Sequence, residues 1–341
     1  MKKIIISMMA VAALAACSKS EVAFEQPDAI GFQVVTGKMT KAAVADNVYP
    51  EALNMYVFAM TETDGGAANT TADYLKNAEF AKVLVSNGQN LWGGWLNNAA
   101  YPYYWPNVKK LYFAGVSKSG NVNNGAVPTY NNGTITINGY QPGVGTAVLG
   151  DNDLMWFPTT DDSYGKGTVS VPVVMKHACS WITVKMAGDE WTAGRYTITD
   201  IHIEGLTTKG NVDLNTAADW TLSTDAADQN KTFTVYSNAT GKALSTTATA
   251  EGFENIVNNT VVLPEQVPGT LSITYHFESQ AGENIEETVT GSLKFNGEAA
   301  WVAGTHYIYT VTITASQILI APTVETWTPS PAEGGHGVTV Q

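Results

Sequence analysis

Short runs of apolar and β-branched residues recur along this chain, and polar, glycine-containing turns such as Asn132-Gly133 and Asn138-Gly139 separate them. Strand-like patterns occupy the segments 30–35, 53–60, 111–116, 134–137, 169–175, 181–186, 196–203, 232–236, 260–263, 271–277, 287–295, 306–314 and 317–320. Residues 71–82 are the one candidate for a short helix. Many short strands without helices between them predict an all-β fold of sandwiches rather than βαβ units.

The length of 341 residues suits two domains better than one. A polar, glycine-rich stretch at 161–167 has the composition of a linker. The half before it is rich in aromatic residues, and the half after it has cleaner strand alternation. We therefore expect a domain boundary near residue 165.

The first residues have the pattern of an export signal. Lys2 and Lys3 precede an apolar stretch at 4–14 that is too short to span a bilayer. Leu14-Ala-Ala-Cys17 then resembles the lipobox of bacterial lipoproteins, in which the cysteine thiol accepts a diacylglyceryl group. A plain signal peptide with an incidental cysteine is the less favoured interpretation. The sequence thus predicts lipidation at Cys17.

Charge and cysteine content exclude some partners and bonds. The net charge is −13, and Arg195 is the single arginine, so the chain lacks the clustered cations that nucleic-acid binding requires. With Cys17 lipidated, only Cys179 remains, and no intramolecular disulfide is available. Cys179 lies in an apolar run, which favours a buried structural thiol.

No residue pattern marks an active site or a metal site. The five histidines lack metal-ligand spacing, and neither a Gly-x-Ser-x-Gly elbow nor a phosphate-binding loop occurs. Asp151-Asn-Asp153 and Asp161-Asp162 do not continue as an EF-hand, so turn roles are favoured over calcium binding. We therefore predict no catalytic residue, no metal and no cofactor.

An aromatic cluster supports a second function. Trp92-Gly-Gly-Trp95 is followed by Tyr101-Pro-Tyr-Tyr-Trp105. Exposed aromatic rings can stack on sugars, so a surface glycan-binding lipoprotein is the alternative function. Packing inside a sandwich is the favoured interpretation of these rings, because large aromatics dominate cores.

Both ends of the chain have strand-like patterns. Ile30, Phe32 and Val34 share one face of an early strand. At the other end, Val338 and Val340 follow a proline- and glycine-rich break at 329–337. A strand that pairs outside its own sandwich and an edge strand on its own sheet explain this last pattern equally well.

In their order along the chain, these features resemble the fimbrillin-like proteins of Bacteroidetes, which are type V pilus subunits derived from lipoproteins. The residues that carry the resemblance are the lipobox at Cys17, Ile30-Gly-Phe32, Thr40-Lys-Ala42, Tyr104-Trp-Pro106, Lys110-Leu-Tyr-Phe-Ala114, Asp153-Leu-Met-Trp156, Lys176-His177 with Ile182-Thr-Val184, Leu263-Pro-Glu-Gln266, Trp301-x-x-Gly304-x-x-Tyr307-x-Tyr309, and Trp327. The resemblance runs over nearly the whole chain.

The resemblance implies two β-sandwich domains of transthyretin-like Greek-key type, without enzymatic activity. The expected divisions are a signal peptide at 1–16, a lipidated propeptide with a removable first strand at 17–41, an N-terminal domain at 42–165 and a C-terminal domain at 166–341.

The resemblance also implies a route of assembly. A protease would cleave after Lys38 or Lys41 and remove the strand that carries Ile30, Phe32 and Val34. A terminal strand of another pilin subunit would fill the vacated groove, and in this chain the donor would be the segment with Val338 and Val340.

The implied role is a structural pilus subunit that serves adhesion. The precursor would be held in the outer membrane by its lipid, and the mature chain would lie in a fimbrium at the cell surface. Its expected partners are other pilin subunits, in a homopolymer or a heteropolymer, and a host protein or glycan.

Overall fold

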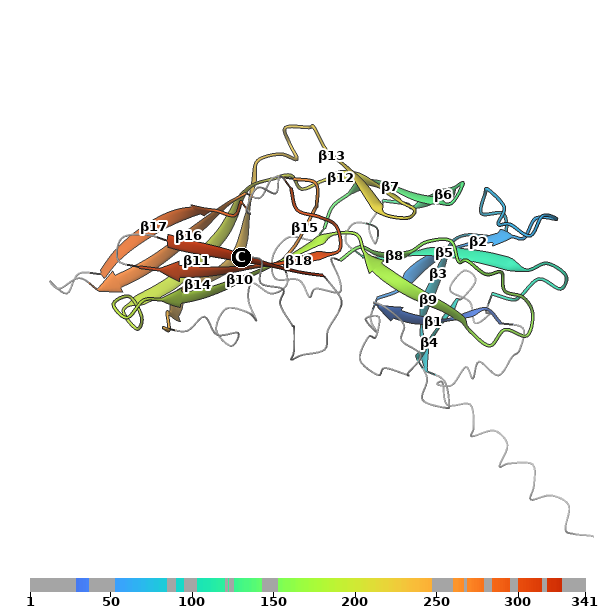
Figure 1. The fold of residues 1–341 in the computed structure, drawn as a ribbon, viewed down its shortest axis with the longest axis horizontal. Helices are drawn as coiled ribbons and strands as arrows, with labels where there is room; N and C mark the ends of the chain where they lie inside the picture. The colour runs from blue at the N-terminus through green and yellow to red at the C-terminus, as the bar shows by residue number, and fades with distance from the viewer. Residues whose placement is uncertain are drawn as a thin grey trace, which may run out of the picture.

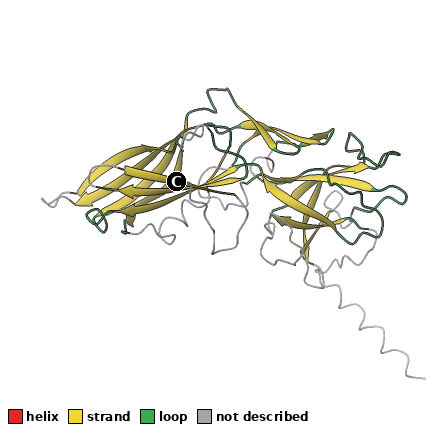
Figure 2. Cartoon of the chain, viewed as in Figure 1, coloured by secondary structure: helices red, strands yellow, loops and turns green. Residues whose placement is uncertain are grey.

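The computed structural model describes residues 29–36, 53–84, 90–94, 103–119, 122, 126–142, 153–246, 260–266, 269–278, 284–294, 300–314 and 318–326. Within these ranges the regular elements are all strands (Figure 2), which confirms the all-β prediction. No helix long and apolar enough to cross a membrane occurs in this part of the chain. Each predicted strand segment overlaps an observed strand.

The first half of the molecule is built around a closed barrel of seven strands. In order around the barrel these are β1 (Gly31–Thr36), β4 (Asn90–Gly94), β3 (Leu75–Leu84), β2 (Met55–Thr61), β5 (Leu111–Ser117), β8 (Met155–Phe157) and β9 (Val171–His177). Strand β9 follows residue 165, so the barrel takes its last strand from beyond the expected boundary. The division of the chain into domains stays a prediction, as does the transthyretin-like strand order.

The second half is a sandwich of two four-stranded sheets (Figure 1). One sheet has the order β15 (Thr260–Val262), β10 (Ser180–Gly188), β18 (Thr305–Ile313), β19 (Ile318–Thr326). The other has the order β14 (Lys231–Ala243), β11 (Tyr196–Leu206), β16 (Thr270–Glu278), β17 (Asn284–Ser292). Their facing side chains, including Ile182, Ile201 and Tyr309, form one continuous apolar core, as expected for packed sheets with alternating inward residues.

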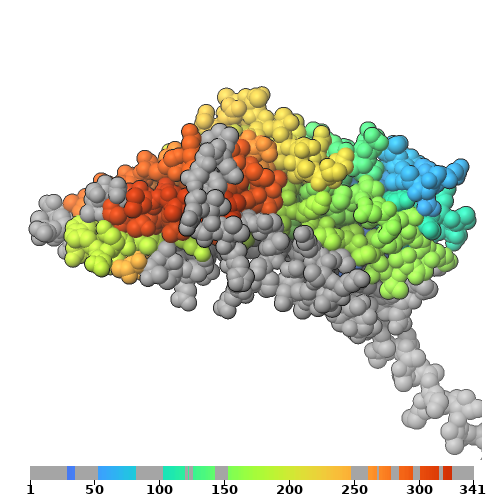
Figure 3. Space-filling model, viewed as in Figure 1, coloured from blue at the N-terminus to red at the C-terminus, as the bar shows by residue number. Residues whose placement is uncertain are grey.

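A further sheet connects the two halves. Its order is β13 (Ala218–Leu222), β12 (Gly210–Leu214), β7 (Thr134–Tyr140), β6 (Thr129–Asn131). Figure 3 shows the residues of β12 and β13, in yellow, on the surface above the junction of the barrel and the sandwich. This connecting sheet therefore takes strands from both halves of the sequence.

The connecting sheet explains why β2 and β5 are apolar along almost their whole length. One set of alternating side chains, such as Val57 and Phe113, points into the barrel. The other set, such as Phe58 and Tyr112, packs under the connecting sheet. Strands buried on both faces read as continuous apolar runs rather than alternating ones.

The expected helix at 71–82 is wrong, because Leu75–Leu84 forms β3. The register of β3 shifts against β2 between the pairs Val57–Ala78 and Ala59–Leu75. This bulge puts the buried residues Leu75 and Ala78 three positions apart. A three-residue spacing of apolar positions imitates the helical period.

Candidate functional site

Strand β1 is the element that closes the barrel. It pairs in parallel with β9 from Phe32–Val171 to Thr36–Met175. On its other side it pairs antiparallel with β4, through Gly31–Gly93 and Phe32–Trp92. Figure 1 shows β1, in dark blue, beside β9 and β4. Without β1, these two neighbours would each have an unpaired edge.

The three side chains expected on one face of β1 all point into the barrel core. Ile30 and Phe32 are fully buried, and Val34 is 4% exposed. Gln33, which lies between them, is exposed. Burial of each such side chain contributes roughly 1.5–3 kcal/mol, so β1 is held by its side chains as well as by its backbone hydrogen bonds.

Phe32 lies at the centre of an aromatic cage. Its ring centroid is 5.0 Å from that of Phe80 and 5.1 Å from that of Phe113, both in edge-to-face geometry. The Phe157 ring lies 6.2 Å away at a tilted angle. These three rings come from β3, β5 and β8. Edge-to-face pairs at this spacing contribute beyond simple area burial.

The start of β1 is tied to the segment around Trp105. The Ile30 amide donates to the Tyr103 carbonyl at 2.8 Å, and the Trp105 indole nitrogen donates to the Ala29 carbonyl at 3.1 Å. Trp105 is 4% exposed, and the Tyr103 ring stacks on Phe80 at 5.3 Å. These two members of the aromatic cluster pack in the core, as the favoured interpretation predicted.

Other members of that cluster differ or lie outside the described residues. Tyr104 is 40% exposed, and its carbonyl accepts a hydrogen bond from the Tyr74 hydroxyl at 2.6 Å. Trp95 and Tyr101 fall outside the described ranges. Among the described members of the cluster, Tyr104 is exposed, Tyr103 is half-buried and Trp105 is buried.

Several predicted site residues lie outside the described residues. These are Cys17, Lys38, Lys41, Val338 and Val340. They stay predictions from the sequence.

The last described strand, β19, lies at the edge of its sheet and pairs with β18 over its whole length. Ile318 and Ile320 pack against the sandwich core, as does Val324. Pro322, which has no backbone N–H to donate, lies in the middle of this edge strand, where proline is tolerated. The segment 318–326 is thus an edge strand of its own sandwich.

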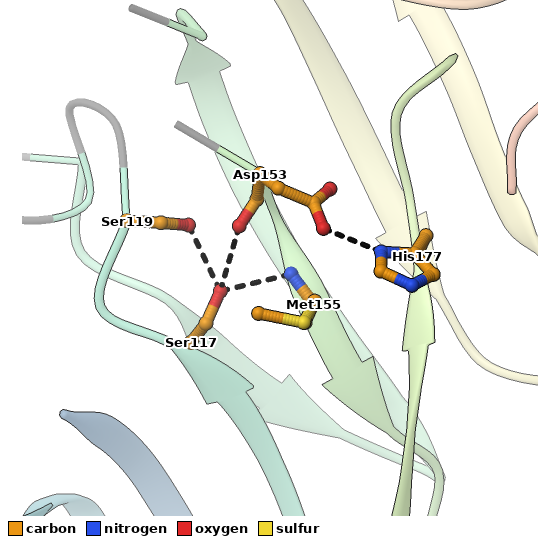
Figure 4. A network of polar contacts seen from close by, with 5 residues as sticks. All are labelled: Ser117, Ser119, Asp153, Met155 and His177. Atoms are coloured by element: carbon orange, nitrogen blue, oxygen red, sulfur yellow. Dashed lines mark hydrogen bonds and ion pairs between the residues drawn. The ribbon is translucent and has the colours of Figure 1, made fainter. Parts of the chain in front are cut away.

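A buried polar cluster joins the barrel strands β5, β8 and β9 near the connecting sheet (Figure 4). His177 Nδ1 and Asp153 Oδ2 form a close hydrogen bond, and the two side chains are 6% and 3% exposed. The Ser117 hydroxyl accepts from the Met155 amide at 2.8 Å and donates to the Asp153 carbonyl at 3.3 Å. Its distance to the Ser119 hydroxyl is 2.8 Å.

This cluster contains Ser, His and Asp, but its arrangement serves packing. The hydrogen bonds of Ser117 join it to Ser119 and to backbone groups. A catalytic serine would instead donate its hydroxyl hydrogen bond to a base such as the histidine. We expected a turn role for Asp153, and the structure makes it a buried acceptor. Sequence reasoning missed the pair because Asp153, just before β8, and His177, at the end of β9, are 24 positions apart along the chain.

Cys179 follows this cluster and is a buried free thiol, as predicted. Burial raises the pKa of the Cys179 thiol well above its usual value, and the charge of Asp153 raises it further. The thiol is therefore protonated and unreactive at neutral pH. Among the described residues, no group of three or more His, Cys, Asp or Glu side chains is placed to hold a metal ion.

Solved structures with the same fold are known. A fimbrial protein from Bacteroides vulgatus matches with a TM-score of 0.52 at 16% identity, covering 88% of this chain and 100% of that chain. Candidate cell adhesion proteins from Bacteroides ovatus and Bacteroides uniformis match with TM-scores of 0.53 and 0.50, at 13% and 17% identity. They cover 88% of this chain and 97% and 99% of their own. A search of curated proteins finds no match.

The family comparison covers most of the chain. The model of the fimbrillin-like family matches residues 40–327. This range includes the barrel strands from β2 onward, the connecting sheet and the whole sandwich. The chain therefore belongs to the fimbrillin-like family.

Proposed function

We propose that this chain is a structural subunit of a bacterial surface pilus with a role in adhesion, assembled by proteolytic trimming and strand exchange. Membership of the fimbrillin-like family supports the pilus role, and one neighbour of the same fold is described as a fimbrial protein. The observation that carries the assembly route is that β1, at the start of the described chain, closes the barrel between β9 and β4.

Exchange of β1 is physically reasonable because the strand fills a core. Its loss would expose the interior side of Phe80 and Phe113 and two unpaired strand edges. Exposed edges and apolar interiors drive association with another strand. A strand supplied by the next subunit would pair the two edges again and refill the apolar interior. Repetition of this head-to-tail contact would build an open filament.

The expected processing sites have a suitable position in the sequence. Lys38 and Lys41 follow β1, which ends at Thr36. Cleavage there would break the covalent connection between the barrel and β1, together with the lipid expected on Cys17. The precursor would be an outer-membrane lipoprotein, and the trimmed subunit would enter the surface fimbrium. Val338 and Val340 are the proposed donor residues toward the next subunit.

The test is limited digestion with a lysine-specific protease, followed by intact mass and size-exclusion chromatography. We expect a cut at Lys38 or Lys41 and then ladders or fibres. The matched control is the Lys38→Gln, Lys41→Gln double variant, which should resist the cut and stay monomeric. A wild-type chain that is trimmed at either lysine but remains monomeric under all concentrations would contradict the strand-exchange route.

A further inference from the structure

We propose that the slot between β4 and β9, which β1 occupies, selects its donor strand through one aromatic side chain at the place of Phe32. A subunit whose donor strand carries this ring would then bind more tightly than a second copy of this chain. The inference rests on the proposed strand exchange and adds the chemistry of the partner. The strand already seated in the slot supplies the argument, because it shows which side chains the slot fits.

The cage around Phe32 is filled by a ring. Phe80 and Phe113 lie edge-on to it, at interplanar angles of 85° and 89°, and Phe157 lies at 44°. Phe32 itself has no exposed surface. A valine at this position would leave these three rings with a void on one side.

The three rings around Phe32 are packed against other residues on their far sides, so they cannot move to fill such a void. Phe80 is stacked on Tyr103, and Phe113 is held edge-on by Trp105 at 5.7 Å. Phe157 packs directly over Gly115, where even a methyl group would come within 2.3 Å of the ring. The cost of a smaller side chain rises when the surrounding structure cannot relax into the space.

The positions on either side of Phe32 are less demanding. Val34 pairs with Val173 of β9, and Ile30 is buried in the same apolar core. Hydrophobic residues of similar volume are tolerated best at such positions. Gln33 faces outward and is exposed. The slot therefore accepts an extended segment that runs parallel to β9, with hydrophobic residues at the places of Ile30 and Val34 and an aromatic residue at that of Phe32. Between Ile30 and Val34, only the place of Gln33 is open to a polar residue.

The donor residues proposed for this chain do not match that pattern. Val338 and Val340 have the spacing of Phe32 and Val34, but valine would stand where the slot holds an aromatic ring. Residues 328–341 include no Phe, Tyr or Trp. The donor strand of a second copy would leave the cage partly empty, so it would bind more weakly than a strand of another subunit that carries an aromatic residue at the place of Phe32.

The test uses the full chain with a site-specific protease sequence in place of residues 37–41, cut after purification. A labelled peptide of residues 28–36 is exchanged into the cut protein, and unlabelled peptides compete with it in fluorescence anisotropy. The competitors are the native peptide, its Phe32→Val and Gln33→Ala forms, and a peptide of residues 333–341.

We expect the Phe32→Val and 333–341 peptides to compete at least about tenfold more weakly than the native peptide, and the Gln33→Ala peptide to compete equally. Competition by Phe32→Val within about threefold of the native peptide would overturn aromatic selection and leave strand exchange intact. Failure of the native peptide itself to exchange would overturn strand exchange, and aromatic selection with it.

Discussion

At the scale of single residues, His306 is the buried group with the clearest energetic role. Its ring stacks on Trp181 at 3.6 Å with an interplanar angle of 7°, and its Nε2 lies 2.8 Å from the Thr183 hydroxyl oxygen. Burial, with a smaller effect from the positive charge of Lys185, lowers the pKa of His306 to about 3. The folded state therefore holds this imidazole in its neutral form.

This lowered pKa predicts a pH-dependent stability. Above pH 6.5 the imidazole is neutral in both states. As the pH falls from 6.5 toward 3, only the unfolded chain takes up the proton, so the free energy of unfolding decreases. The contribution lost between pH 7 and pH 5 is roughly 2 kcal/mol. Urea unfolding at both pH values should show this loss in the wild type and a smaller one in His306→Asn; equal losses would contradict it.

At the scale of elements, β3 depends on one residue with an unusual backbone. Asn77 has a φ of 50° at the bulge against β2, and its side-chain amide donates to the Pro128 carbonyl at 2.5 Å. Asparagine adopts this left-handed conformation more easily than other residues with a Cβ, and β-branched residues adopt it least easily. Asn77 therefore fixes the bulge and connects β3 to the segment before β6.

Two substitutions at Asn77 separate its roles. Asn77→Gly keeps the backbone conformation and loses the hydrogen bond, which should cost about 1 kcal/mol. Asn77→Val loses the bond and also strains the backbone, which should cost about 1–2 kcal/mol more. Chemical denaturation of both variants measures the difference. Equal stability of the two variants would show that the positive φ imposes no constraint.

At the scale of the whole molecule, the barrel and the sandwich share a core under the connecting sheet. Phe58 and Tyr112 enter this core from the barrel, and Val261 and Leu263 enter it from the second half. Trp220 of β13 packs there, 9% exposed, and its indole nitrogen donates to the Ala178 carbonyl at 2.7 Å. A shared apolar core couples the unfolding of the parts that it joins.

Truncation of Trp220 should weaken that coupling. We expect the wild type to unfold in one cooperative transition. Trp220→Ala should cost about 3–5 kcal/mol in the connecting core and split the thermal transition into two in differential scanning calorimetry. Trp191→Ala is the control, since Trp191 is 47% exposed. A single transition in Trp220→Ala would show that the two halves are coupled by other contacts.

The amino-acid sequence determined the all-β class and most strand positions, because alternation and turn residues are properties of neighbouring residues. The strands that it missed are β3, β4, β6, β8, β12 and β13. The bulge gives β3 an apolar spacing like that of a helix. Strands β6 and β8 have only three residues each, which is too short for a clear alternating pattern. Ile30, Phe32 and Val34 were correctly assigned to one apolar face from their spacing alone.

Only the tertiary structure decided what that face contacts. The partners of β1, at Val171 and Gly93, lie far along the chain from Phe32, and the cage rings come from three other strands. The pair formed by Asp153 and His177 likewise joins residues that are distant along the chain. Local patterns record which side of a strand is buried, whereas the choice of neighbour depends on the free energy of packing all the strands together.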